Sequence, residues 1–83
     1  MRPAQFSGKH NLRARTRGRY LLNTKYPQLR GKRLCIVGSA AQGNYASDAA
    51  IEWALGQPGI DAEALATGGF VKIGAAKVWI TYE

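Results

Sequence analysis

The stretch LRARTRGRYLL, residues 12–22, decides how the fold of this chain begins. Its alternate positions are arginines: Arg13, Arg15, Arg17 and Arg19. Alternation with a period of two is typical of a β-strand, whose successive side chains point to opposite faces, whereas a helix would scatter these arginines around its circumference. We therefore predict a strand with its arginines on one face. Because Gly18 interrupts the pattern, an arm that stays disordered until it binds a partner is the alternative.

The positive charge is concentrated in the first third of the chain. Residues 1–33 contain ten Lys and Arg and no acid, whereas residues 34–83 contain two lysines and five acids. The two parts therefore carry +10 and −3, which together give the net charge of +7. A segregation this sharp bears on association and solubility rather than on fold, and it indicates a negatively charged partner.

The segments that follow the arginines predict a turn, a buried strand and a loop. Residues 26–31, YPQLRG, contain a proline and a glycine in an arrangement typical of turns. The apolar run within KRLCIV, residues 32–37, is consistent with a strand that is buried on both faces. The small residues of 38–44 predict a loop.

The main helix is predicted to begin near Ala46 or Ser47 and to stop at Gly56. The hydroxyl of Ser47 can accept a hydrogen bond from a free amide of the first turn. Asp48 and Glu52 lie toward the positive end of the helix dipole. We expect both acids on the solvent side, opposite a wide apolar face.

The remaining residues predict a short helix and a β-hairpin. Residues 61–67 have the features of a helix capped by Asp61. Residues 70–73 and 77–82 are rich in β-forming residues, and a glycine-containing loop joins them. The expected fold is an α+β domain of two layers: an antiparallel sheet, in the order β-β-α-β-β, with one main helix. We expect this single domain at residues 12–83, preceded by a flexible basic arm at residues 1–11.

The sequence offers no catalytic or metal-binding constellation. His10 has no carboxylate near it in the sequence, and Cys35 is expected to pack as a small apolar side chain in a strand. Gly38 and Gly43 have the spacing of a phosphate-binding loop, but its lysine and hydroxyl are missing. We therefore expect a non-enzymatic protein without a cofactor. With no apolar run able to span a bilayer or to act as a secretory signal, a cytoplasmic protein without membrane association is expected.

The basic segment is the candidate binding site. On a strand, alternate arginines would lie about 6.6 Å apart, and each planar guanidinium group can bind phosphate oxygens in pairs. Neighbouring lysines and tyrosines would add charge and rings on which bases can stack. The full candidate set is Arg13, Arg15, Arg17, Arg19, Tyr20, Lys25, Tyr26, Arg30, Lys32 and Arg33. The leading hypothesis is a module that binds nucleic acid, DNA or RNA, with modest sequence preference.

Partners other than nucleic acid could also bind the positively charged segment. The alternative hypothesis is an inhibitor or adaptor of the phage or mobile-element type, similar to anti-CRISPR proteins, that blocks an acidic surface of a host protein or nucleoprotein complex. Such a protein would use its basic face, or the aromatic side chains Trp53 and Trp79, which we expect to be exposed. Exposed tryptophans would also suit a symmetric homodimer. The simplest alternative is a solvated basic segment that serves solubility alone.

Overall fold

Four strands form one antiparallel sheet in the order β2-β1-β4-β3. The computed structural model describes residues 12–81, and its strands are β1 (Arg33–Val37), β2 (Gly43–Tyr45), β3 (Phe70–Ile73) and β4 (Ala76–Thr81). The two central strands pair along their lengths, from Arg33 opposite Thr81 to Val37 opposite Lys77. The prediction of an α+β domain with an antiparallel sheet is confirmed.

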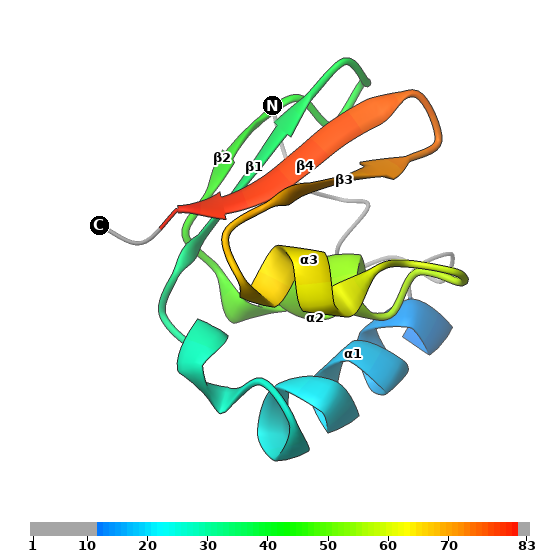
Figure 1. The fold of residues 1–83 in the computed structure, drawn as a ribbon. Coiled ribbons are helices and arrows are strands. Elements are labelled where there is room, and N and C mark those ends of the chain that lie inside the picture. The colour runs from blue at the N-terminus through cyan, green and yellow to red at the C-terminus, as the bar shows by residue number, and fades with distance from the viewer. Residues whose placement is uncertain (1–11, 82–83) are drawn as a thin grey trace.

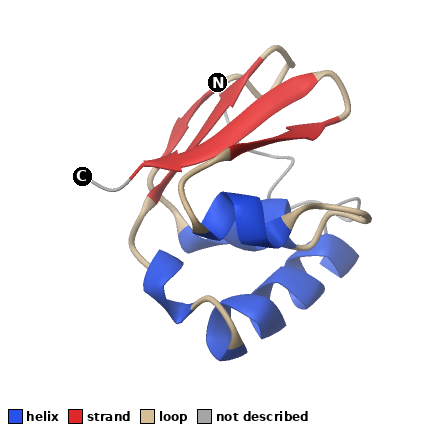
Figure 2. Ribbon diagram, in the orientation of Figure 1, coloured by secondary structure: helices blue, strands red, loops and turns tan. Residues whose placement is uncertain are grey.

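The helices stack in two layers on one side of this sheet (Figure 1). Helices α2 (Asp48–Leu55) and α3 (Ala62–Ala66) cover the sheet directly, and α1 (Leu12–Thr24) lies on the far side of α2. A short 3-10 helix, η3 (Pro27–Leu29), leads from α1 to the sheet. The expected architecture of two layers with one main helix is therefore wrong, because α1 adds a third layer. No helix of residues 12–81 covers the opposite face of the sheet (Figure 2).

The hydrophobic core includes all three layers. Along β4, Ala76, Val78 and Ile80 are buried, while Lys77 and Trp79 alternate with them on the other face of the sheet. The largest fully buried side chains are Leu22, Leu29, Leu34, Ile36, Ile51, Leu55, Leu65 and Val78. Because Leu22 belongs to α1, this helix is an integral part of the fold and not an appended arm.

Residues 12–22 are helical, so the strand predicted for them is wrong. The alternative, an arm that stays disordered until it binds a partner, does not fit this helix either. The stretch has two periods at once. Ala14, Gly18 and Leu22 recur every four residues, and they form the buried face of α1. Arginine has a high helix propensity, whereas alanine and glycine give a strand little surface to pack. Burial of the four-residue pattern therefore prevails over the alternation of the arginines.

The backbones of α1 and α2 meet at two glycines. A β-carbon added to Gly18 would lie 1.7 Å from the carbonyl oxygen of Glu52, and one added to Gly56 would lie 1.6 Å from the carbonyl oxygen of Ala14. No carbon atom can occupy either position, because packed interiors hold non-bonded atoms at van der Waals distance. Each helix thus presents a glycine to the backbone of the other. Small residues at the crossing permit this short distance between the helix axes.

The local signals in the second half of the chain are confirmed. Ser47 caps α2 by accepting a hydrogen bond from the amide of Ala49 at 3.1 Å. Asp61 caps α3 in the same way through the amide of Ala64, also at 3.1 Å. β3 and β4 form the expected hairpin, and Gly74 begins its two-residue loop with a φ of 62°. A positive φ at this position is why glycine is needed there.

Three expectations for this half are wrong. The loop at 38–44 ends in an edge strand, because residues 43–45 pair with β1 as β2. Glu52 is not on the solvent side of α2: it is only 6% exposed because α1 covers it. Trp53 and Trp79 are half-buried rather than exposed. The basic arm predicted for residues 1–11 lies outside the described residues.

Gly18→Ala tests the contact between α1 and α2. In an isolated helix, alanine is more favourable than glycine by roughly 1 kcal/mol. Here we expect the opposite sign, a loss of about 2–3 kcal/mol in the free energy of unfolding, because the added methyl group must push two backbones apart. Urea unfolding followed by circular dichroism measures the change. Thr16→Ala, on the exposed side of the same helix, is the control; equal stability of the two variants would contradict the close packing.

Candidate functional site

The four arginines of α1 do not form the row that we predicted. Arg15 and Arg19 lie one helical turn apart, and both reach the carboxylate of Glu52 on α2. Arg15 Nη2 lies 3.4 Å from Oε1, and Arg19 Nε lies 3.4 Å from Oε2. These distances are long for hydrogen bonds, so attraction between opposite charges holds the three groups together more than a tight bidentate fork does.

Glu52 depends on these two arginines because it is buried. A carboxylate removed from water without a counter-charge destabilises a fold by several kcal/mol in general. Two guanidinium groups against one carboxylate leave an excess positive charge at this surface, where the Arg19 side chain is 55% exposed. Two of the four arginines predicted to bind phosphate are therefore engaged within the molecule, and their first role is structural.

Arg17 is held by the end of α2. Its Nε donates to the carbonyl oxygen of Gly56 at 2.9 Å, and its Nη2 donates to the same oxygen. The last carbonyls of a helix lack partners, and the helix dipole there favours a cation, so this contact caps α2. A carbonyl carries no net charge, and the charge of Arg17 is therefore not neutralised. Arg13 lies exposed in the first turn of α1.

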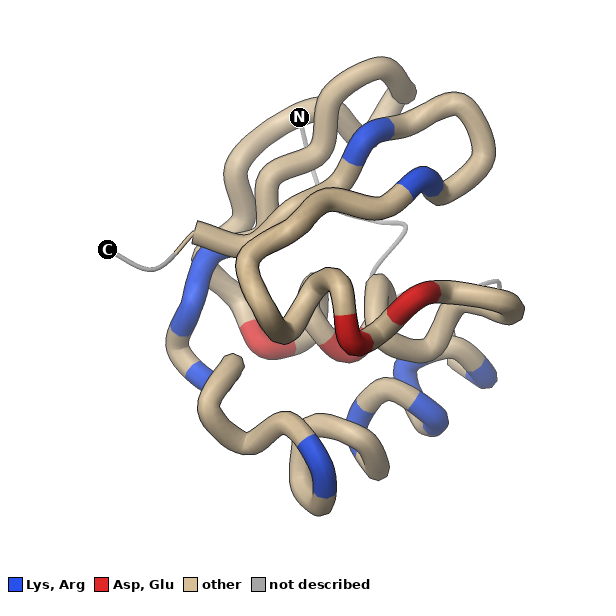
Figure 3. Tube along the Cα trace, viewed as in Figure 1, with Lys and Arg blue, Asp and Glu red and all other residues tan. Residues whose placement is uncertain are grey.

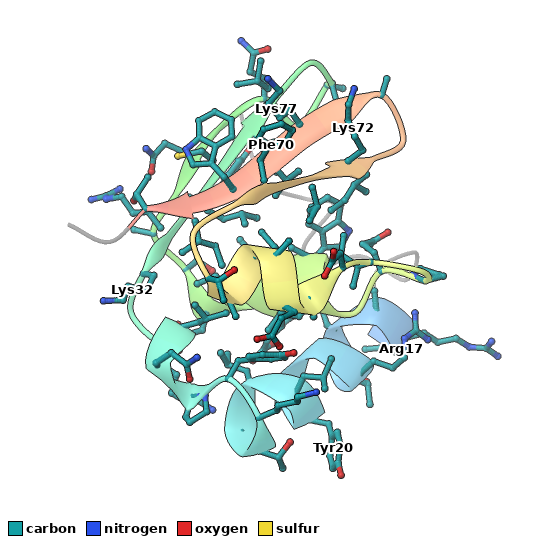
Figure 4. The ribbon with its side chains drawn as sticks, viewed as in Figure 1. Arg17, Tyr20, Lys32, Phe70, Lys72 and Lys77 are labelled. Carbon is teal, nitrogen blue, oxygen red and sulfur yellow. The ribbon has the colours of Figure 1, made fainter. Side chains whose placement is uncertain are left out.

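The aromatic residues near α1 differ in exposure. Tyr26 is buried, and its hydroxyl donates to Glu63 Oε1 at 3.2 Å, so the base stacking predicted for this ring is wrong. Lys25 is exposed, and its Nζ lies 5.6 Å from the centroid of the Tyr26 ring. Tyr20 is 68% exposed on the side of α1 that faces away from α2 (Figure 4).

The last three candidates follow η3. Arg30 forms an ion pair with Asp48, with 3.1 Å between Nη1 and Oδ2. Arg33 is exposed, and its Nη1 donates to the side-chain oxygen of Asn44 at 3.2 Å. Lys32 is half-buried. Of these three side chains, Arg33 thus combines exposure with a partner that leaves its charge unneutralised.

The charges are arranged in layers (Figure 3). The acids of the described residues are on α2 and α3 or cap them, in the middle layer: Asp48, Glu52, Asp61 and Glu63. The basic residues lie in the outer layers, on α1 and the segment after it and on the sheet (Figure 3). The ion pairs of Glu52 and Asp48 join the middle layer to the α1 side. Both outer surfaces are therefore left positive.

The open face of the sheet carries residues that the sequence reasoning did not select. Phe70 on β3 lies directly opposite Trp79 on β4, and Lys72 lies directly opposite Lys77. Phe70 is 57% exposed, and both lysines are exposed (Figure 4). The signal was present in the predicted hairpin: these four residues occupy alternate positions, between the apolar residues that face the core. They were not selected because the candidate site was chosen from the arginine-rich segment at the start of the chain.

Other chemistry would need a metal site, a reactive cysteine or a phosphate-binding loop within residues 12–81. Within residues 12–81, no three His, Cys, Asp or Glu side chains gather closely enough to hold a metal ion. Cys35 is buried, as expected, and its Sγ lies 3.4 Å from Nδ2 of Asn44. The amide of Gly38 donates to the side chain of Gln42 at 3.2 Å, so the glycine-containing loop uses this amide internally.

The helices of residues 12–81 are too short or too polar for any of them to span a membrane. No protein-family model, no curated protein and no solved structure matches this chain. Its function must therefore be inferred from its two basic surfaces, the outer side of α1 and η3 and the open face of the sheet.

Glu52→Gln tests the structural role of the arginines. The substitution keeps the shape of the side chain but removes the charge that holds Arg15 and Arg19 one turn apart. We expect the free energy of unfolding to fall by about 2–3 kcal/mol, because both guanidinium groups lose their counter-charge in a partly buried site. The matched control is Glu63→Gln, an exposed position whose amide oxygen can still accept from Tyr26. Thermal and urea unfolding that cannot distinguish these two variants would refute the role.

Proposed function

We propose that this protein is a non-catalytic nucleic-acid-binding protein whose surface cations contact phosphates. The observation that carries the proposal is the layered charge: the acids of residues 12–81 lie in the middle layer, where Glu52 and Asp48 are ion-paired, and the basic residues lie in both outer layers. On the α1 side, Arg17 and Lys25 contact a carbonyl and an aromatic ring, groups that do not neutralise them. Arg13, in the first turn of α1, is a third exposed cation.

A polynucleotide is the partner that best matches such a surface. Its phosphates repeat at short intervals, so several dispersed cations can be neutralised by one ligand. Each phosphate that is neutralised releases condensed counterions to the solution, and this release favours binding. The net charge of +7 also accelerates encounter with any polyanion at low salt. Contacts to phosphates fix the position of a strand rather than its sequence, so sequence preference is expected to be modest.

Arg15 and Arg19, the two cations at Glu52, contribute only indirectly to the proposed binding. Arg15 and Arg19 remain paired with the carboxylate, because withdrawing either would leave a buried charge. Their excess charge attracts phosphate, while exposed cations such as Arg13 and Lys25 make the contacts. Tyr26 is not part of the site, since its ring is buried.

Titration at several salt concentrations tests the proposal. The probes are a single-stranded DNA, a single-stranded RNA, a DNA duplex and polyglutamate of similar length. We expect nucleic acid to bind with a dissociation constant below about 10 µM at low salt, and log K to fall against log salt with a slope of about −3 or steeper. Weaker binding to all nucleic-acid probes would overturn the proposal. Polyglutamate that binds as tightly as nucleic acid would also overturn it, in favour of an acidic protein partner.

Neutral substitutions test the α1 surface itself. In the double variant Arg13→Gln, Lys25→Gln, we expect the salt slope to become shallower by about 1–2, since roughly 0.7–0.9 is lost with each phosphate contact. Both side chains are exposed, so stability should be unchanged. The matched control is Arg13→Lys, Lys25→Arg, which keeps both charges and should keep the slope. An unchanged slope in the neutral variant would exclude these residues from the interface.

A further inference from the structure

We infer that the open face of the sheet is where the bases of a single-stranded nucleic acid stack, an inference that rests on the proposed function. Residues directly opposite each other on paired strands share a face, so the strand registers give its layout. Trp79 on β4 and Phe70 on β3 lie directly opposite each other and form an aromatic row, which the buried Cys35 on β1 extends across the sheet. The two central strands and β3 thus build a platform with Trp79 at its middle and Phe70 toward its edge.

Cations flank this aromatic row on both sides. Two residues along the strands in one direction, Lys77 and Lys72 lie opposite each other; two residues in the other direction, Arg33 lies opposite Thr81. Rows on one face of a sheet are about 6.6 Å apart. A strand whose bases stack on the aromatic row can therefore keep its phosphates near Arg33 on one side or the lysines on the other.

The electrostatics of this face favour an anion. Like charges directly opposite on neighbouring strands are destabilising, and Lys72 and Lys77 are such a pair. Lys77 Nζ lies 4.6 Å from the centroid of the Phe70 ring, a cation–π contact that brings charge to the stacking surface. Among residues 12–81, no acid lies on this face of the sheet, because the acids are in the helix layer. A phosphate between the lysines would remove their repulsion.

The exposed ring of Phe70 distinguishes single strands from duplexes. A duplex presents only its backbone and groove edges, whereas a single strand presents the faces of its bases to an aromatic side chain. Stacking on aromatic rings is tolerant of sequence, because every base has a π-face. We therefore expect single-stranded DNA and RNA to bind this face in preference to duplex, with little discrimination between them.

Tryptophan fluorescence provides a direct readout of this platform. Trp53→Phe leaves Trp79 as the sole tryptophan, and its emission then reports on the centre of the sheet. We expect (dT)12 to quench this emission on binding. Inorganic polyphosphate of comparable length supplies the charge without bases, so it should bind more weakly and leave the emission unchanged. A DNA duplex of 12 base pairs should also cause little quenching.

Matched aromatic substitutions locate the stacking. Phe70→Ala removes an exposed ring from the sheet, and we expect it to weaken (dT)12 binding about tenfold, the usual loss for one stacked base. Tyr20→Ala removes an exposed ring from α1, on the opposite side of the molecule (Figure 4). Tyr20 belongs to the candidate set from the sequence, but stacking on the sheet predicts that its loss changes the affinity less than twofold. Lys72→Gln should weaken (dT)12 binding and make its salt dependence shallower. Circular dichroism checks that each of the three variants is folded.

The outcomes separate this inference from the proposed function. If nucleic acid binds but the two aromatic variants are equivalent, or if (dT)12, duplex and polyphosphate bind alike without quenching, the stacking platform is refuted and phosphate binding stands. If no nucleic acid binds at low salt, the proposed function fails, and the platform fails with it. Quenching by (dT)12 that Phe70→Ala weakens and Tyr20→Ala does not would establish the site.

Discussion

The contact of two helix backbones at Gly18 and Gly56 determines how the rest of this molecule is arranged. Where glycine meets a neighbouring carbonyl, no side chain separates the helices, so residues on either side are brought within reach of the partner helix. Arg15 lies nearly one turn before Gly18 and Arg19 directly after it, and both therefore meet Glu52. The second contact, at Ala14 and Gly56, brings Arg17 to the end of α2. A packing constraint thus decides which charges are used inside the fold.

This arrangement has a consequence for the surface. The two acids of α2 form ion pairs with basic residues of α1 and of the segment after η3: Glu52 with Arg15 and Arg19, and Asp48 with Arg30. The same acids are then not available to neutralise the sheet, whose exposed cations stand beside aromatic rings. The charge segregation that is visible in the sequence is converted into a segregation of layers, with positive charge on both outer surfaces (Figure 3). A surface of that kind concerns association rather than stability.

The elements predicted correctly are those whose signals are local. Ser47 and Asp61 cap the helices that follow them, and Gly74 supplies the positive φ of the hairpin loop, all within a few residues. Residues 12–22 satisfied both a strand and a helix pattern, and only the position of α2, more than thirty residues on, decides between them. The prediction that Glu52 faces solvent was wrong for the same reason, because its burial depends on α1. The residues on the open face of the sheet belong to a correctly predicted hairpin, but the arginines were selected as the candidate site instead because of their charge.

The ion pairs of the α1 side are the reason why we propose the sheet as a site of direct contact. Drawing Arg15 or Arg19 to a phosphate would strand the carboxylate of Glu52, a loss of several kcal/mol that a surface phosphate contact does not repay. Within residues 12–81, neither Lys72 nor Lys77 is ion-paired, and a phosphate drawn to either would offset the unfavourable placement of two like charges directly opposite each other. Arg15 and Arg19 therefore stabilise the protein and add to the positive potential of its surface. In the proposed interface, the lysines and rings of the sheet therefore join exposed cations such as Arg13 and Lys25 in contacting the ligand.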